Sequence, residues 1–226
     1  MASFDYVAYQ KSVSDRMVTA KEQAGVHGIL KELQMVGDEA ESLIAEDPGD
    51  RSLIDCAAGC KTCCVVNVST LLPEGLAIAR YLQTQGQETV QATRERLEAL
   101  WGEVRGLDDE DRLFVRRSCA FLDEKGCCSI YPVRPLLCRS VTSTDAQNCR
   151  DALSGLVLGE ETAVLMHQFQ QNLYESLFTG VADGLEATGL DGRSFQLTGL
   201  LRYLLKHPQA ETDWMDGKRL SWQDIF

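Results

Sequence analysis

The sequence lacks the features that mark several common protein classes. It has three histidines in 226 residues and no G-x-S-x-G, P-loop, G-x-G-x-x-G or H-E-x-x-H motif. No segment approaches the roughly 18 to 20 apolar residues that span a bilayer, and the first ten residues do not resemble a signal peptide. We therefore expect a cytoplasmic protein with reduced thiols, without a familiar hydrolase, nucleotide or zinc-protease site. The histidines are expected to be structural.

Basic residues are also scarce relative to acidic ones. The chain has 22 Lys and Arg against 34 Asp and Glu, a net charge of −12. Such a field repels phosphate backbones and anionic lipid, so we expect no nucleic acid and no membrane as partner. The expected partner is an unidentified protein or small-molecule substrate. The 44% apolar composition suffices for a hydrophobic core, so a metal would add a site to a folded chain.

The apolar pattern predicts a mainly α fold with a small β-hairpin, in which helices surround a cysteine-rich metal site. Period-3.6 apolar patterns indicate helices over 4–46, 73–82, 88–104, 160–178 and 195–206. The acidic run Asp108–Asp111 is expected to be a loop. Two β-prone runs, 114–122 and 127–131, flank turn residues 123–126 and predict the hairpin.

Three regions are expected along the chain. They are an N-terminal helical arm (1–48), a cysteine-cluster metal-binding domain (49–156) and a C-terminal helical segment (157–226) packed on it. Gly25 and Gly28 leave open whether the arm is one long helix or a helical hairpin. The arm could form a homodimer with another copy, although folding back on its own domain is commoner. Trp214, Trp222 and Phe226 are expected to dock the tail.

Cysteine is the abundant exception, with nine residues mostly in two groups. A disulfide framework is typical of small secreted chains in an oxidising compartment, so it does not fit here. Closely spaced thiolates hold zinc or iron–sulfur clusters, and Cys60-x2-Cys63 has suitable spacing. Gly59 favours a tight metal knuckle over a helix at this point. Clustering favours metal binding over ordinary packing of cysteine as a small hydrophobe.

Adjacent cysteines add a constraint. Neighbouring side chains diverge in most backbone conformations, so Cys63-Cys64 and Cys127-Cys128 are each unsuited to chelating one ion. The sequence therefore indicates either more than one metal centre or one ligand and one packed thiol in each pair. Cys127 is the candidate for a packed thiol.

Two arginines follow the second group of cysteines. Arg134 lies between two prolines, and Arg139 directly follows Cys138. Several thiolates are net anionic, so these cations are expected either to tune the site or to bind an anionic substrate. We assign Tyr131, Arg134 and Arg139 to cofactor binding; an ordinary structural or surface role is the alternative.

The motifs of both cysteine groups resemble a known family. Cys60-Lys-Thr-Cys63-Cys64 and the run from Cys119-Ala-Phe-Leu through Gly-Cys-Cys128-Ser-Ile-Tyr-Pro-Val-Arg-Pro-Leu-Leu-Cys138-Arg139 are similar to the signature of the bacterial YkgJ-type CxxCxxCC zinc- or iron-chelating proteins. The resemblance covers about residues 56–149. Cys56 departs from it, because three residues separate it from Cys60 where the family has two. The resemblance implies eight metal ligands: Cys56, Cys60, Cys63, Cys64, Cys119, Cys128, Cys138 and Cys149.

The family resemblance also implies a range of chemistry. The cysteine domain is similar to that of flagellin lysine N-methylase, which implies an iron–sulfur cluster, such as [4Fe–4S], and methyl transfer from S-adenosylmethionine. We prefer iron–sulfur to zinc for this reason and because of the adjacent pairs.

Three other functions stay open. One is a non-enzymatic zinc or iron carrier. Another is a dithiol redox protein. The third is a radical S-adenosylmethionine enzyme, for which Cys56-x3-Cys60-x2-Cys63 has the spacing. Two features argue against a radical enzyme. Thr62 stands before the third cysteine, where an aromatic residue is usual, and no repeated strand–helix pattern follows.

Overall fold

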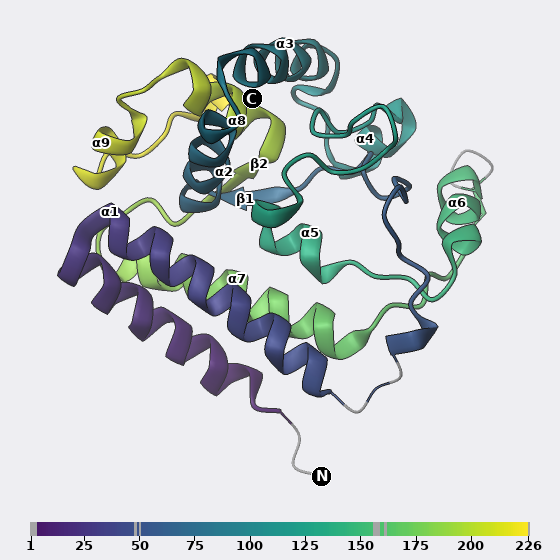
Figure 1. Ribbon diagram of the computed structural model, residues 1–226, viewed down its shortest axis with the longest axis horizontal. Helices are drawn as coiled ribbons and strands as arrows, with labels where there is room; N and C mark the ends of the chain where they lie inside the picture. The colour runs from purple at the N-terminus through teal and green to yellow at the C-terminus, as the bar shows by residue number, and fades with distance from the viewer. Residues whose placement is uncertain (1–3, 48, 50, 156–158, 161, 226) are drawn as a thin grey trace.

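The computed structural model describes residues 4–47, 49, 51–155, 159–160 and 162–225. The expected boundaries at residues 48 and 156, and the expected docking of Phe226, lie outside these ranges. The described chain is mainly helical, with one small antiparallel sheet, so the predicted fold class is confirmed (Figure 1). No helix within these ranges is long and apolar enough to cross a membrane.

The N-terminal arm is a helical hairpin, which resolves the alternative left open above. Helix α1 (Tyr6–Glu46) begins at Asp5, whose carboxylate accepts the Ala8 N–H at 2.9 Å, and bends at Ala24 and Gly25, where φ is +55° at the glycine. Its two limbs run side by side and pack on α7 (Gln168–Ala187) (Figure 1). The arm thus folds back on its own chain.

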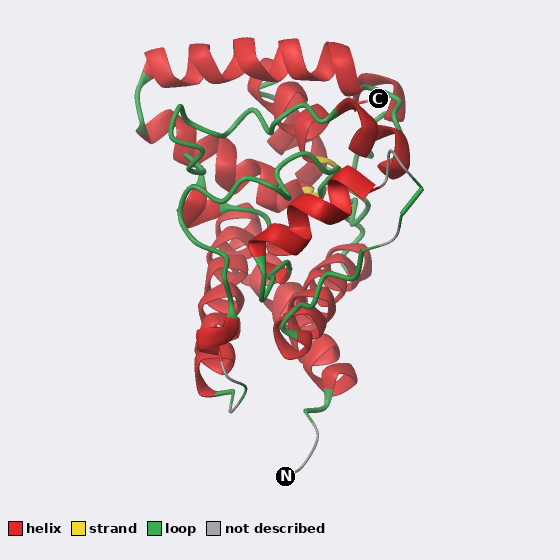
Figure 2. Cartoon of the chain, turned by 90° about the vertical axis from the view of Figure 1, so that its right-hand side faces the viewer, coloured by secondary structure: helices red, strands yellow, loops and turns green. Residues whose placement is uncertain are grey.

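A second layer surrounds the sheet. Strands β1 (Ser69–Leu71) and β2 (Ser194–Gln196) are antiparallel, with Thr70 opposite Phe195. Helices α2 (Leu72–Thr84), α3 (Gln87–Val104) and α8 (Leu197–Lys206) pack against one another next to it. Figure 2 shows the two strands enclosed among helices. Apolar side chains of both layers form one continuous core.

The C-terminal tail docks on this layer. Helices α9 (Ala210–Met215) and α10 (Trp222–Ile225) follow α8. Trp214 is fully buried, and the Trp222 ring lies 5.0 Å from that of Phe195. The expected docking of these two tryptophans is thus observed.

Several local expectations were wrong. The acidic run is the first turn of α4 (Asp109–Val115), because the Asp108 carboxylate caps the Asp111 N–H at 2.8 Å. The expected hairpin is a turn closed by a single bridge, Leu122–Cys128, and the sheet is made by β1 and β2 instead. Helix α7 begins at Gln168, eight residues later than expected, because His167 caps it.

The remaining short elements lie around the cysteines. They are η1 (Arg51–Leu53), η2 (Tyr131–Val133), α5 (Leu136–Ser140) and α6 (Ala146–Gly155).

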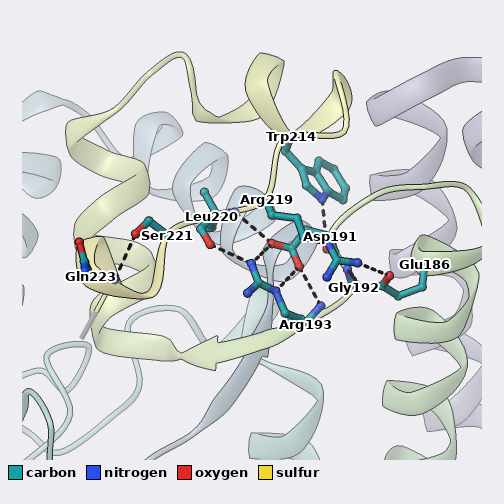
Figure 3. Close-up of polar contacts among 9 residues, drawn as sticks. All are labelled: Glu186, Asp191, Gly192, Arg193, Trp214, Arg219, Leu220, Ser221 and Gln223. Atoms are coloured by element: carbon teal, nitrogen blue, oxygen red, sulfur yellow. Dashed lines mark hydrogen bonds and ion pairs between the residues drawn. The ribbon is translucent and has the colours of Figure 1, made fainter.

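A buried ion pair ties the tail to the loop before β2 (Figure 3). Asp191 is fully buried and accepts two hydrogen bonds of 2.7 Å from Arg193, together with the Leu220 N–H at 3.1 Å. Its backbone oxygen accepts the Trp214 indole N–H at 3.2 Å. Burial alone would raise the pKa of Asp191, but the hydrogen bonds from Arg193 and Leu220 hold it below its usual value. The carboxylate is therefore ionised and stabilises the fold at neutral pH.

Replacing this carboxylate should destabilise the protein. We expect Asp191→Asn to lower the free energy of unfolding by about 2 kcal/mol, less than the ~3–5 of a fully buried pair because Arg193 is 26% exposed. Urea unfolding at pH 7 measures the change. Asp15→Asn is the matched control in an exposed pair with Lys11, with an expected change within about 0.5 kcal/mol. Equal effects of the two substitutions would contradict the assigned role of Asp191.

Candidate metal centre

The segment from residue 55 to residue 66 forms consecutive turns, as the glycine at position 59 predicts. The Cys60 N–H donates to Ala57 O at 3.0 Å, and the Cys64 N–H donates to Lys61 O at 3.0 Å. Gly59 has a φ of +87°, which a residue with a side chain rarely adopts. This knuckle runs from η1 toward β1 between α4, α5 and α6 (Figure 1).

One end of the knuckle joins the second cysteine group. The Cys119 N–H donates to Cys64 O at 2.7 Å. The β-bridge between Leu122 and Cys128 places Cys128 beside the segment that follows Cys119. Cys119 and Cys128 pack against the hydrophobic core. Cys138 lies on α5 and acts electrostatically on Cys64. We call Cys64, Cys119, Cys128 and Cys138 the inner set.

The two turns touch backbone to backbone at their glycines. A Cβ atom added to Gly126 would lie 3.2 Å from Gly59 O, and both residues have positive φ. The close approach brings the knuckle against the turn that carries Cys127 and Cys128. Cys127 itself is half-buried, and its N–H donates to Asp123 Oδ1 at 2.8 Å.

The other end of the knuckle joins α6. The Asp55 N–H donates to Ser143 O at 2.8 Å, and the Asp55 carboxylate accepts the N–H of Ala146, the first residue of α6, at 2.9 Å. The Cys56 thiol donates to Ser143 O at 3.9 Å. Cys149 lies one turn into α6 and, with Cys60 and Cys63, acts electrostatically on Cys56. We call Cys56, Cys60, Cys63 and Cys149 the outer set.

The thiols of the two sets overlap in environment, because burial also raises the pKa of Cys56 and because Cys60 and Cys149 are half-buried like the inner thiols. Burial raises the pKa of Cys119 to about 11 and raises those of Cys128 and Cys138. The Cys64 thiol donates a hydrogen bond to Cys63, which lowers the pKa of Cys63 and raises that of Cys64. Inner thiols thus keep their protons unless a metal ion replaces them. Cys56 and Cys63, both of the outer set, are exposed.

Arg134 is the cation that faces the thiols. Its guanidinium stacks 4.5 Å from the ring centre of Tyr131, which is 61% exposed. Its positive charge acts to lower the pKa values of Cys63, Cys128 and Cys138. The guanidinium of Arg134 is therefore well placed to balance the negative charge of several thiolates.

Arg139 faces its own loop. Its guanidinium donates to Pro132 O at 3.0 Å and to Arg134 O at 3.1 Å, and it contacts Glu41 on α1 at 3.3 Å. Tyr174 on α7 donates to the same Glu41 oxygen at 2.8 Å. Arg139 therefore braces the loop that carries Arg134 and Cys138.

Glu74 lies at the site, but the sequence did not identify it as a site residue. It is 3% exposed, and its two carboxylate oxygens accept the N–H groups of Leu71 and Leu136, each at 2.7 Å. These bonds join the start of α2 to the start of α5, two residues before Cys138. Pro73-Glu74 at a helix start signals capping, but no sequence signal shows the long-range contact. Burial raises the pKa of Glu74 to about 7.

A second cation lies beside the inner set. Arg112 is 3% exposed, and its guanidinium donates to the carbonyl oxygen of Arg117, two residues before Cys119. Burial lowers the pKa of Arg112, and the charge of Cys119 acts in the opposite direction. Its Nη1 atom has no hydrogen-bond partner among the described residues.

The donor set fits a thiophilic metal. All nine cysteines are free, and thiolates are ligands that suit zinc or iron–sulfur clusters. Within the described ranges, no three His, Cys, Asp or Glu side chains converge as a ready-made metal site. Metal binding supplies free energy to order such ligands, since it replaces thiol protons with a stronger bond.

The fold and this region define a mainly helical protein with a cysteine-rich region. Residues 55–155 match the model of the CxxCxxCC family, described as "Putative zinc- or iron-chelating domain", so the family resemblance is confirmed for this part of the chain. No curated protein and no solved structure matches the chain.

The raised pKa of Glu74 predicts a pH-dependent stability. An acid with a raised pKa binds a proton more tightly in the folded state, so stability falls as pH rises from about 4.5 to about 7. At about 1.36 kcal/mol per pKa unit, the fall is about 3 kcal/mol. In urea unfolding across this range, Glu74→Gln should lack this contribution, whereas the exposed Glu88→Gln should retain it. Parallel pH profiles of native and Glu74→Gln protein would contradict the prediction.

Proposed function

We propose that residues 55–149 bind iron, as an iron–sulfur cluster, or zinc through eight cysteines. The observation that carries this proposal is that the knuckle, which contains four free thiols, is hydrogen-bonded to Cys119 at one end and to Ser143 and Ala146, three residues before Cys149, at the other. The ligands are Cys56, Cys60, Cys63, Cys64, Cys119, Cys128, Cys138 and Cys149. Cys127 is the packed thiol of its pair.

Iron–sulfur is the preferred metal centre, with [4Fe–4S] as one form. The resemblance to flagellin lysine N-methylase supports methyl transfer from S-adenosylmethionine, for which the bound cluster would supply substrate ligation. Tyr131 and Arg134 flank the thiols near the surface and are the residues for the carboxylate of this cosubstrate to contact. Arg139 positions their loop.

A non-enzymatic zinc or iron chelator is the second candidate. The observation that favours it is the family description itself, which names chelation and no reaction. A closed site with protein sulfur at every coordination position would fit this function, whereas catalysis needs an open position. A radical enzyme fits less well, because the described residues form a sheet of two strands where such enzymes have a partial barrel.

Elemental analysis tests the proposed function. Protein purified without oxygen should contain iron with acid-labile sulfide in similar amounts, or zinc without sulfide. Loss of a ligand should weaken metal retention against a chelator by at least about tenfold, since even residues behind the ligands contribute 10–100-fold. We expect this from Cys63→Ser and from Cys138→Ser.

Cys127→Ser is the matched control and should retain the native metal content. Metal-free native protein, or unchanged metal content in both ligand variants, would overturn the proposal. Iron with sulfide would make S-adenosylmethionine binding the next measurement, whereas zinc alone would favour the chelator.

A further inference from the structure

We infer that Arg116 is a positioning residue of the proposed chelating site. Its guanidinium holds the last turn of α6, the helix that carries Cys149, to the segment that leads into Cys119. This inference rests on the proposed function, because Cys149 is one of the proposed ligands. It adds to that function a residue from outside the proposed ligand set, which the sequence did not single out.

Helix α6 stands apart from the other helices. Figure 1 shows it at the edge of the molecule, and Figure 2 shows it in front of the remaining helices. Within the described chain it does not pack side by side with another helix or strand, and of its ten residues only Gly155 is buried. A helix shorter than about 12 to 15 residues is marginally stable in water by itself. The stability of α6 therefore depends on the groups that hold its two ends.

Carboxylates hold the first turn of α6. Asp55 in the knuckle accepts the Ala146 N–H at 2.9 Å. Asp145 accepts the N–H groups of Gln147 and Asn148 at 2.7 and 3.2 Å. These bonds satisfy N–H groups that have no partner inside the helix, and their negative charge favours the positive end of the helix dipole. The first turn of α6 is thus fixed to the knuckle.

Arg116 holds the other end of α6. Its guanidinium donates to the carbonyl oxygen of Leu153 at 2.6 Å. Carbonyl groups in the last turn of a helix have no partner inside the helix, and a cation favours this negative end of the dipole. Arg116 itself follows the last residue of α4 and lies three residues before Cys119. Helix α6 is therefore held between the two cysteine-bearing segments, by the knuckle at one end and by the approach to Cys119 at the other.

The backbone of Arg116 supports a dedicated role for its side chain. Its φ of +52° is the only positive value at a residue other than glycine in the described chain. Glycine is the usual residue where a helix ends in this left-handed conformation, because a Cβ atom makes the conformation unfavourable. A turn that directs the guanidinium to Leu153 gives a reason for an arginine at this position. The conformation and the hydrogen bond thus point to the same role.

Amide hydrogen exchange of α6 tests this role in the full-length, metal-free protein. Arg116→Gly accepts the left-handed backbone but lacks the guanidinium. We expect the amides of residues 146–155 to exchange about threefold faster or more, as the loss of one hydrogen bond predicts, without a fall in the urea midpoint of unfolding. Arg116→Lys keeps a charged donor and should restore most of the protection. Arg117→Gly is the matched control, since the Arg117 side chain pairs with Glu103 and does not hold α6.

Metal retention connects this position to the site. Zinc-loaded Arg116→Gly should release zinc to a chelator about threefold faster or more than native protein, because Cys149 is then held less firmly beside the knuckle. Arg117→Gly should release zinc at the native rate, and Arg116→Lys should approach it.

The outcomes separate this inference from the proposed function. If native protein neither contains iron nor binds zinc, the proposed function fails, and the role of Arg116 at the site fails with it. If native protein holds metal, but Arg116→Gly retains it equally well or exchanges its α6 amides at the native rate, the proposed function stands and the role of Arg116 is wrong. A lower urea midpoint in Arg116→Gly, with faster exchange in every helix, would show a general structural role and would also contradict the inference.

Discussion

Negative charge among packed thiols is the constraint on which the cysteine region depends. Removing a proton from a buried thiol is unfavourable, and each further thiolate nearby makes the next one harder to form. The chain meets this constraint with cations that have no carboxylate partner among the described residues. Arg134 faces the thiols from the η2–α5 loop, and Arg112 is buried behind Cys119. These two arginines thus place positive charge beside the thiols in a protein whose net charge is −12.

The helical layers hold this arrangement in place through polar contacts that cross between elements. Glu74 fixes the start of α5 from α2, and Arg139 fixes the preceding loop while contacting α1. Asp55 fixes the start of α6 from the knuckle. None of these residues needs to touch a metal to matter, because ligand groups bind tightly only when their backbone is already positioned. Helix α1 carries Glu41, so the packing of α1 on α7 also supports the contact between Glu41 and Arg139.

The sequence predicted features governed by short-range patterns. Apolar periodicity located the long helices, although it placed the start of α7 too early, and the glycine at position 59 correctly indicated a turn. Cysteine spacing and the motif through Arg139 predicted the family match of residues 55–155. The sequence did not show the long-range contacts of Glu74, nor the pairing of β1 with β2, because each joins residues far apart in the chain. Arg112 was missed because an arginine after four acidic residues in an expected loop is typical of the surface, and only the folded chain buries it.

The pairing of β1 with β2 has a consequence for the independence of the chelating domain. The family match ends at residue 155, yet β1 obtains its only strand partner in the described chain from residues 194–196. Cutting the chain at the family boundary would leave the edge of β1 unpaired and would uncover the faces of α2 and α3 on which α8 lies. The region that the family model matches therefore has narrower bounds than the packed structure around it, because β2 and α8 lie outside the match.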